Sequence, residues 1–397
     1  MAKISKQTRS NILNALVIFL TIGIVIYLGA ANGEMGNAWS ALISSDLRWI
    51  GMAFVCYGIY LVFESMGVHV FFRQQGFKPK FGSSLLVSII GLFYSSVTPA
   101  ATGGQPMQVF AFKKRGIPSG VSSSALAVKF FCFQVALLGT GVLLWALNPQ
   151  IVSDCFRAYP AAQVMVITGF ILNGFTVVAV LLLAINKNIV RAIITFIIFL
   201  GRKLRIVKDP AGTASRMDAT MADFHASVDM VTHHPGKLMV LLLISVVQVL
   251  GLMSISYCVY RAFGLNGHGY GDVVVLQFLL FIGASFTPLP GASGAQEGGF
   301  AWMFGSVFPS DVLFGALLLW RFMTYYLNLL IGLGCVIFDR TVSMKKYAQK
   351  NKAEKIAADE TADDTILEKG QDDVVQENEE TAGYVVSAAQ SCSEEAD

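Results

Sequence analysis

Long apolar stretches separated by short basic or polar segments dominate the chain. A membrane-crossing helix needs roughly 20 apolar residues. Six stretches meet that length: residues 11–30, 47–67, 119–147, 161–185, 237–263 and 311–338. The first stretch is interpreted as a span because its apolar run is longer than that of a signal peptide. The pattern predicts an all-α polytopic membrane protein with about six transmembrane helices.

Two further apolar stretches, residues 81–112 and 272–308, are interrupted by proline and glycine. The breaks are residues 98–106 and 287–297, and their helix-breaking residues are Pro99, Gly103 and Gly104 in the first and Pro288, Pro290, Gly291 and Gly294 in the second. Proline removes a backbone donor, and hydrocarbon has no water to satisfy the freed backbone groups. A broken helix at membrane depth is typical of a polar cavity. We therefore predict two re-entrant hairpins with their tips at these motifs.

The distribution of lysine and arginine predicts the orientation. Basic residues lie in residues 1–10, after the second span, on both flanks of the first hairpin and after Phe338, whereas the second hairpin has almost none. By the positive-inside rule, both termini and the open end of the first hairpin are cytoplasmic. Three crossings separate the two motifs, so the hairpins are predicted to open on opposite faces. This arrangement is typical of an inverted repeat. We expect the protein to lie in the cytoplasmic membrane.

Charge divides the chain into a membrane domain, residues 11–340, and a tail, residues 341–397. Charged residues make up 14% of the chain, against about a quarter in soluble domains. From residue 351 onward there are 14 acidic and 3 basic residues, which predicts a disordered cytoplasmic tail. Within the cytoplasmic loop 201–236, the spacing of Met217, Met221, Phe224 and Val228 predicts a short helix. Residues 192–200 are too short to cross and are placed at the cytoplasmic interface or in another hairpin.

One cation follows each motif inside an apolar span. Lys129 lies 24 residues after Gln105, and Arg321 lies 25 residues after Gln296. Each is about 15 Å of helix rise from the end of its span, near the bilayer centre. A cation there costs roughly 2.5–3.5 kcal/mol and is tolerated when it is paired or faces a wet cavity. Glu297 is the obvious partner of Arg321, so a structural ion pair and a substrate-facing role both stay open.

These features predict a midplane site for an anionic group, with cations, amide donors, hydroxyls and the N–H groups of the short helices that follow the glycines. The predicted substrate-binding residues are Thr98, Gln105, Lys129, Thr287, Gln296, Glu297, Arg321 and Tyr325. For the hydroxyls of Thr98, Thr102, Thr287 and Ser293, capping of the broken helix ends is an equal alternative. Glu64 is predicted to reach the membrane interface. The sequence indicates no catalytic residue, metal site, nucleotide-binding loop, cofactor or nucleic-acid partner.

Three segments together resemble the signatures of the flippase-like, lysylphosphatidylglycerol synthase transmembrane-domain family. They are residues 98–109, residues 288–300, and residues 321–326 with Gly332. The resemblance covers nearly all of residues 10–340. One departure is the pair Ala295-Gln296, where the family often has a smaller or glycine-containing pair. Another is Gln105, where some members have glutamate, which puts a shared proton role in doubt.

The resemblance implies movement of a lipid between leaflets, typically an aminoacylated phosphatidylglycerol or another anionic or isoprenoid-linked lipid. Full-length synthases of this family add a cytoplasmic domain that transfers lysine to the lipid. The short acidic segment after Phe338 is expected not to form such a transferase. The alternatives are the membrane part of a lysyltransferase system and a secondary transporter of a small anion. Expected partners are a membrane phospholipid, a second copy of the chain and a separate lipid-modifying enzyme.

Overall fold

The computed structural model describes residues 35–185, 220–229 and 233–341. The predicted span at 11–30, the segment 192–200 and the tail from residue 342 lie outside the described residues. The described part is helical and has no strand. Five of its helices are long and apolar enough to cross a membrane: α3 (Leu47–Gln74), α6 (Ser119–Leu147), α8 (Pro160–Ile185), α11 (Pro235–Ala262) and the helical stretch Ser310–Thr341 that begins with α14 (Ser310–Arg321). The predicted all-α polytopic class is confirmed.

Each broken apolar stretch forms a helical hairpin. The first consists of α4 (Phe81–Val97), a 3₁₀ turn η1 (Pro99–Ala101) and α5 (Gly104–Lys113). The second consists of α12 (Tyr270–Ala284), η2 (Pro290–Ala292) and α13 (Ala295–Phe304). In the first hairpin, a Cβ at Gly91 would overlap Gln108 and a Cβ at Gly104 would overlap Ser95. Glycine therefore lets the two arms pack antiparallel in direct contact.

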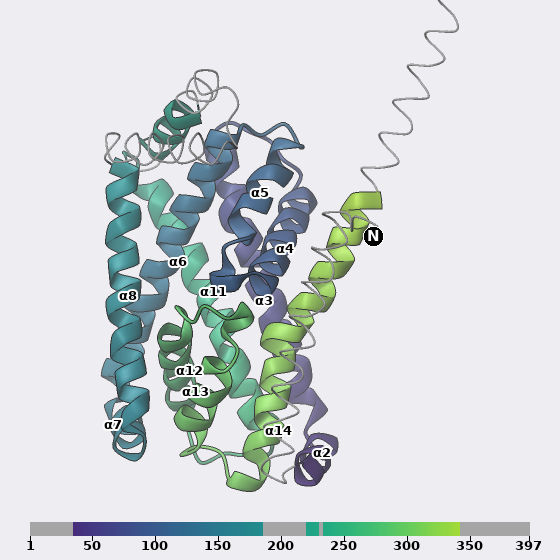
Figure 1. Ribbon diagram of the computed structural model, residues 1–397, viewed down its shortest axis with the longest axis vertical. Helices are drawn as coiled ribbons and strands as arrows, with labels where there is room; N and C mark the ends of the chain where they lie inside the picture. The colour runs from purple at the N-terminus through teal and green to yellow at the C-terminus, as the bar shows by residue number, and fades with distance from the viewer. Residues whose placement is uncertain (1–34, 186–219, 230–232, 342–397) are drawn as a thin grey trace, which may run out of the picture. The chain divides into compact units, whose positions relative to one another are not determined.

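The tips of the two hairpins meet. The backbone N–H of Ala100 donates to the carbonyl oxygen of Pro288 at 3.2 Å. In Figure 1, α4 and α5 extend from the tips toward one end of the helices, and α12 and α13 extend toward the other. The two hairpins thus point in opposite directions along the described helices; their entry into a membrane from opposite faces stays a prediction.

The backbone defines the register of the repeat. The elements η1, α5 and α6 begin at residues 99, 104 and 119, and η2, α13 and α14 begin at residues 290, 295 and 310, always 191 residues later. The Thr-Pro pairs of the sequence would instead align Pro99 with Pro288. The structural register aligns Pro99 with Pro290 and Gln105 with Gln296, because the second tip is two residues longer before its 3₁₀ turn.

Helices α3 and α11 pack antiparallel at the centre of the described residues. Contacts run along both helices, from Cys56 with Cys258 to Gln74 with the Lys237 carbonyl. Gly251 permits this approach, since a Cβ there would lie 3.2 Å from the Cys56 carbonyl oxygen. Close packing through small residues suits a lipid environment, where helix association depends on van der Waals contact more than on the hydrophobic effect.

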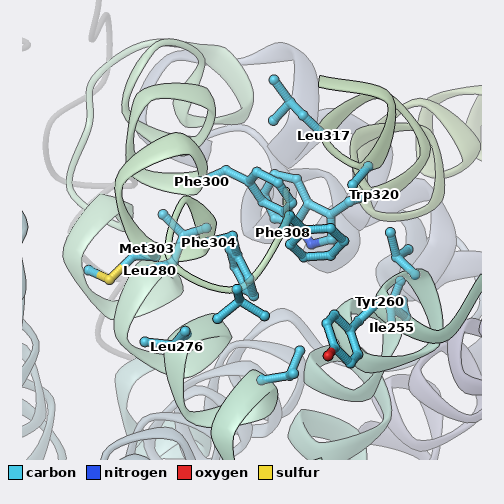
Figure 2. Close-up of a cluster of buried hydrophobic side chains, with 14 of the residues drawn as sticks. Ile255, Tyr260, Leu276, Leu280, Phe300, Met303, Phe304, Phe308, Leu317 and Trp320 are labelled. Atoms are coloured by element: carbon cyan, nitrogen blue, oxygen red, sulfur yellow. The ribbon is translucent and has the colours of Figure 1, made fainter. Parts of the chain in front are cut away.

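An aromatic core fills the second half of the repeat. Phe300 stacks on Phe304 and on Trp320, with ring centroids 4.5 and 4.9 Å apart. Figure 2 shows these rings with Phe308 and Tyr260 in one cluster. The cluster packs α13 against α14 and thereby helps to orient Arg321, which follows Trp320.

Two short helices were not predicted, α2 (Met35–Ile43) and α7 (Pro149–Ala158). Helix α7 is amphipathic and docks through Val152 and Cys155. Burial raises the pKa of the Cys155 thiol to about 11, so the group stays protonated and packs as a small apolar side chain. A helix is present at residues 220–229, as predicted, and Met221 and Val228 are buried there, whereas Met217 lies outside the described residues.

Candidate functional site

Two cavities adjoin at the hairpin tips, with volumes of about 280 and 570 Å³. The smaller, here called the Arg321 cavity, is lined by residues of the second tip and of α14. The larger, the Lys129 cavity, is lined by residues of α3, α5, α6 and α11. Both share the wall residues Tyr60, Leu92, Ser95, Ala100, Ala101 and Phe133. Each cavity therefore holds one of the two cations found in the sequence.

Arg321 is held at the end of α14 by two partners from the second hairpin. Its Nε donates to the Glu297 carboxylate at 2.6 Å, and Nη2 donates to the Gly291 carbonyl at 2.9 Å. The other oxygen of Glu297 accepts the Gly294 N–H at 2.6 Å, which caps the N-terminus of α13. Arg321 is only 4% exposed, so the predicted partnership with Glu297 is a buried ion pair. Such a pair orients the guanidinium but adds little net stability, because both groups lose their hydration.

A π-helical turn, η3 (Phe322–Tyr326), follows Arg321 directly. Such turns occur frequently at functional sites. Here the turn places the Tyr325 ring over Gly291, where a Cβ would overlap it. The Arg321 guanidinium lies 4.9 Å from the Tyr325 ring centroid, within cation–π distance. Tyr325 also donates its hydroxyl to the Ser96 carbonyl at 3.2 Å, which connects the second half to the first tip.

Lys129 forms a buried ion pair with Glu64 of α3, and Gln248 of α11 donates to the same carboxylate at 2.5 Å. The lysine stem lies 3.6 Å from the position of a Cβ on Gly67. Lys129 and Glu64 are 9% and 6% exposed. The prediction that Glu64 reaches the interface is wrong. The apolar run ends at Gly67, but α3 continues to Gln74, so Glu64 lies about 15 Å of helix rise inside the helix end.

The structure distributes the predicted site residues over both cavities. Gln105 and Lys129 line the Lys129 cavity, whereas Thr287, Gln296, Arg321 and Tyr325 line the Arg321 cavity. Glu297 lies behind Arg321 and holds it. Lys129 and Arg321 thus occupy neighbouring cavities with a common wall.

Several of the predicted hydroxyls cap the tips themselves. Thr98 donates to the Tyr94 carbonyl at 2.7 Å and accepts the Gly103 N–H at 2.9 Å. Thr102 and Ser293 donate to Pro99 and Pro290 carbonyls. The capping alternative accounts for these three hydroxyls.

Sequence reasoning missed several residues of the two cavities: Tyr60, Glu64, Gln248, Gln277, Trp320 and Asn328. A signal for three of them was available. Glu64, Gln248 and Gln277 are isolated polar residues inside apolar stretches, and such residues are expensive in a membrane and usually functional. The aromatic residues carry no such signal, since aromatic side chains are common in this chain.

Residues 12–332 match a family model described as the lysylphosphatidylglycerol synthase TM region. The chain belongs to this family. The matched residues include both hairpins and both buried ion pairs of the chain. A relative from Archaeoglobus fulgidus, named a UPF0104 membrane protein, is 22% identical over 300 residues, which are 75% of this chain and 89% of the relative. Membership implies a membrane lipid-related role for a multi-pass membrane protein.

Proposed function

We propose that the protein moves a lipid between the leaflets of the cytoplasmic membrane. The observation that carries this proposal is the pair of adjoining cavities at the meeting hairpin tips, each with a buried cation. The substrate is an anionic or aminoacylated phospholipid, with lysyl-phosphatidylglycerol first among them, or an isoprenoid-linked lipid. The family description, which refers to lysylphosphatidylglycerol synthase, supports a lipid over other cargo.

The head group enters one cavity, passes the common wall and leaves through the other, while its acyl chains stay in the hydrocarbon. Arg321 and Lys129 replace water around the phosphate on the way. Glu297 and Glu64 pair with these cations, and the lipid phosphate competes with the carboxylates when it arrives. Passage requires the Ala100–Pro288 contact between the tips to open. The energy sources that we propose are an ion gradient, a lipid gradient or consumption of the lipid on the outer side.

Neutral replacement of each ion pair tests the role of the cations. We expect the double variants Glu297→Gln/Arg321→Met and Glu64→Gln/Lys129→Met to lower translocation of fluorescent phosphatidylglycerol in proteoliposomes at least about tenfold. Removing both partners leaves no unpaired buried charge, so the variants are expected to insert and fold. Translocation is measured by dithionite quenching of the outer-leaflet label.

The matched control is Arg157→Glu on α7, whose side chain is 81% exposed and forms only a surface pair with Asp154. It should translocate at the unmodified rate. Wild-type rates in both double variants would reject the proposal. Uptake of a water-soluble anion without movement of labelled lipid would favour the secondary-transporter alternative.

A further inference from the structure

The two buried ion pairs differ in what holds the carboxylate besides its cation. Glu297 accepts a backbone N–H as well as Arg321, and it lies in the first turn of α13, where the helix N-terminus favours a negative charge. Glu64 lies in the interior of α3, and its partners are Lys129 and the neutral amide of Gln248. The negative charge of Glu64 therefore depends on its cation much more than that of Glu297 does.

The two carboxylates also differ in access. Glu64 and Lys129 both line the Lys129 cavity of about 570 Å³. In the other cavity, Arg321 belongs to the lining and Glu297 does not. An anion that enters the Lys129 cavity thus meets both partners of the ion pair, and a proton from solvent can reach Glu64 by the same route.

An anion bound to Lys129 changes the surroundings of Glu64. A phosphodiester oxygen that pairs with the Lys129 ammonium displaces Oε1 of Glu64 from it. A carboxylate left buried without a cation is costly, and taking up a proton removes its charge. The proton adds to Oε1, and the new O–H donates to the bound phosphodiester. Oε2 continues to accept from the Gln248 amide, so both oxygens keep a partner.

The other groups around Glu64 leave it as the proton acceptor. Tyr60, which also lines the cavity, already carries its proton at neutral pH. Helices α4, α5 and α11 contribute uncharged residues to the lining. His69, farther along α3, lies against Ser84 and Phe81 of α4 and outside the lining.

We propose that Glu64 takes up one proton when a phosphodiester anion binds to Lys129, so that the Lys129 cavity couples anion binding to protonation. The coupling rests on the proposed lipid translocation and specifies its ion. A phosphodiester carries one negative charge, which one proton balances, so the two cross together without net charge. A pH difference is then the driving force, and the lipid moves with protons from the acidic to the alkaline side.

Calorimetry of the detergent-purified full chain counts the proton. The probe is dihexanoyl phosphatidylglycerol, because a phosphodiester lacks the second ionisation that a phosphate monoester has at about pH 6. Binding at neutral pH is measured in buffers of different ionisation enthalpy. The slope of the observed enthalpy against that ionisation enthalpy gives the number of protons taken up per lipid.

We expect about one proton per lipid for the unmodified protein and about none for Glu64→Gln, whose amide resembles the protonated acid. By linkage, the affinity of the unmodified protein should rise about tenfold for each unit fall in pH near neutrality. The affinity of Glu64→Gln should not change with pH. His69→Gln is the matched control, since it removes another titratable group of α3 and should keep the proton uptake.

Infrared difference spectroscopy gives a second measurement that needs no variant. Addition of lipid to the unmodified protein should produce the C=O band of a protonated carboxylic acid. Lipid binding without this band and without proton uptake would overturn the inference. Equal proton uptake in Glu64→Gln and the unmodified protein would overturn it too.

Dimethyl phosphate is the soluble arm of the experiment. Affinity and proton uptake equal to those with the lipid would support the proton site and assign it to a soluble phosphodiester. Proton uptake on lipid binding without lipid movement in proteoliposomes would reject the proposed function and leave the Glu64 site standing. Lipid movement without proton uptake would reject the coupling and leave the proposed function standing.

Discussion

At the residue scale, the tips depend on left-handed backbone conformations. Gly291 and Gly294 have φ of 61° and 88°, and Ala100, Ala101 and Ala292 have φ of 49°, 55° and 51°. For an L-residue this conformation costs about 1–2 kcal/mol. Strain of this kind persists only where surrounding contacts hold it, and it is often found at functional sites. The motifs predicted broken helices here, but the alanines gave no sign that they carry part of the turn.

Gly291→Ala is expected to destabilise the second tip by at least about 2 kcal/mol, because the new Cβ adds left-handed strain and overlaps Tyr325. The melting temperature of the detergent-purified protein should fall. Gly298→Ala, in α13, is the matched control, since a Cβ there has no neighbour within 4 Å. Alanine in a helix interior should leave stability unchanged or raise it slightly. Equal melting temperatures for the two variants would contradict the packing of Tyr325 on Gly291.

At the element scale, the two halves share a backbone but differ in how they hold their cations. Helix α13 carries Glu297 in its first turn, whereas the structurally equivalent position of α5 is Pro106. Lys129 therefore obtains its carboxylate from Glu64 on α3. The local pattern predicted the start and end of α6, because Pro118 immediately precedes it and Asn148-Pro149 follows it. The same pattern predicted that the second span ends at Gly67, whereas α3 continues to Gln74. The charged residue Arg73 and its neighbours had been interpreted as part of a loop.

The antiparallel packing of α3 on α11 can be tested with native cysteines. The sulfur atoms of Cys56 and Cys258 lie 3.9 Å apart across these helices. Mild oxidation with copper phenanthroline is expected to join them in an intramolecular disulfide after a small shift. Mass spectrometry of the digested protein should detect the linked peptides. Cys258→Ser should abolish this product, and linkage of Cys56 to another cysteine instead would contradict the register.

At the scale of the whole described bundle, hydrogen bonds connect the two halves of the repeat close to the cavities. Asn328 donates to the Ser96 hydroxyl at 2.9 Å, and its carbonyl accepts from Tyr57 at 3.4 Å. The Asn328–Ser96 bond connects the segment after Arg321 to the end of α4, just before the first tip, and the Ala100–Pro288 contact joins the first tip to the second. A shift of the first tip is therefore expected to change the surroundings of the Arg321 cavity, as the proposed passage of a head group requires.

A double-mutant cycle measures this connection. Ser96→Ala and Asn328→Ala are expected to be non-additive in the free energy of unfolding, with a coupling of about 0.5–1.5 kcal/mol. Ser96→Ala combined with Ser153→Ala, an exposed residue of α7, should be additive. Additivity in both pairs would show that the Ser96–Asn328 bond does not join the halves.

The sequence alone determined the membrane class, the spans among the described residues, the two helix breaks and the cations that follow them. Apolar length and proline–glycine chemistry are local properties, so they can be read along the chain. Only the tertiary structure decided that the cations lie in two adjoining cavities, that Glu64 and Gln248 hold Lys129, and that Gln277 and Trp320 line a site. These relations join residues far apart in the sequence, such as Glu64 and Gln248, which are 184 positions apart. The rotation of each helix about its axis is set by packing against its neighbours.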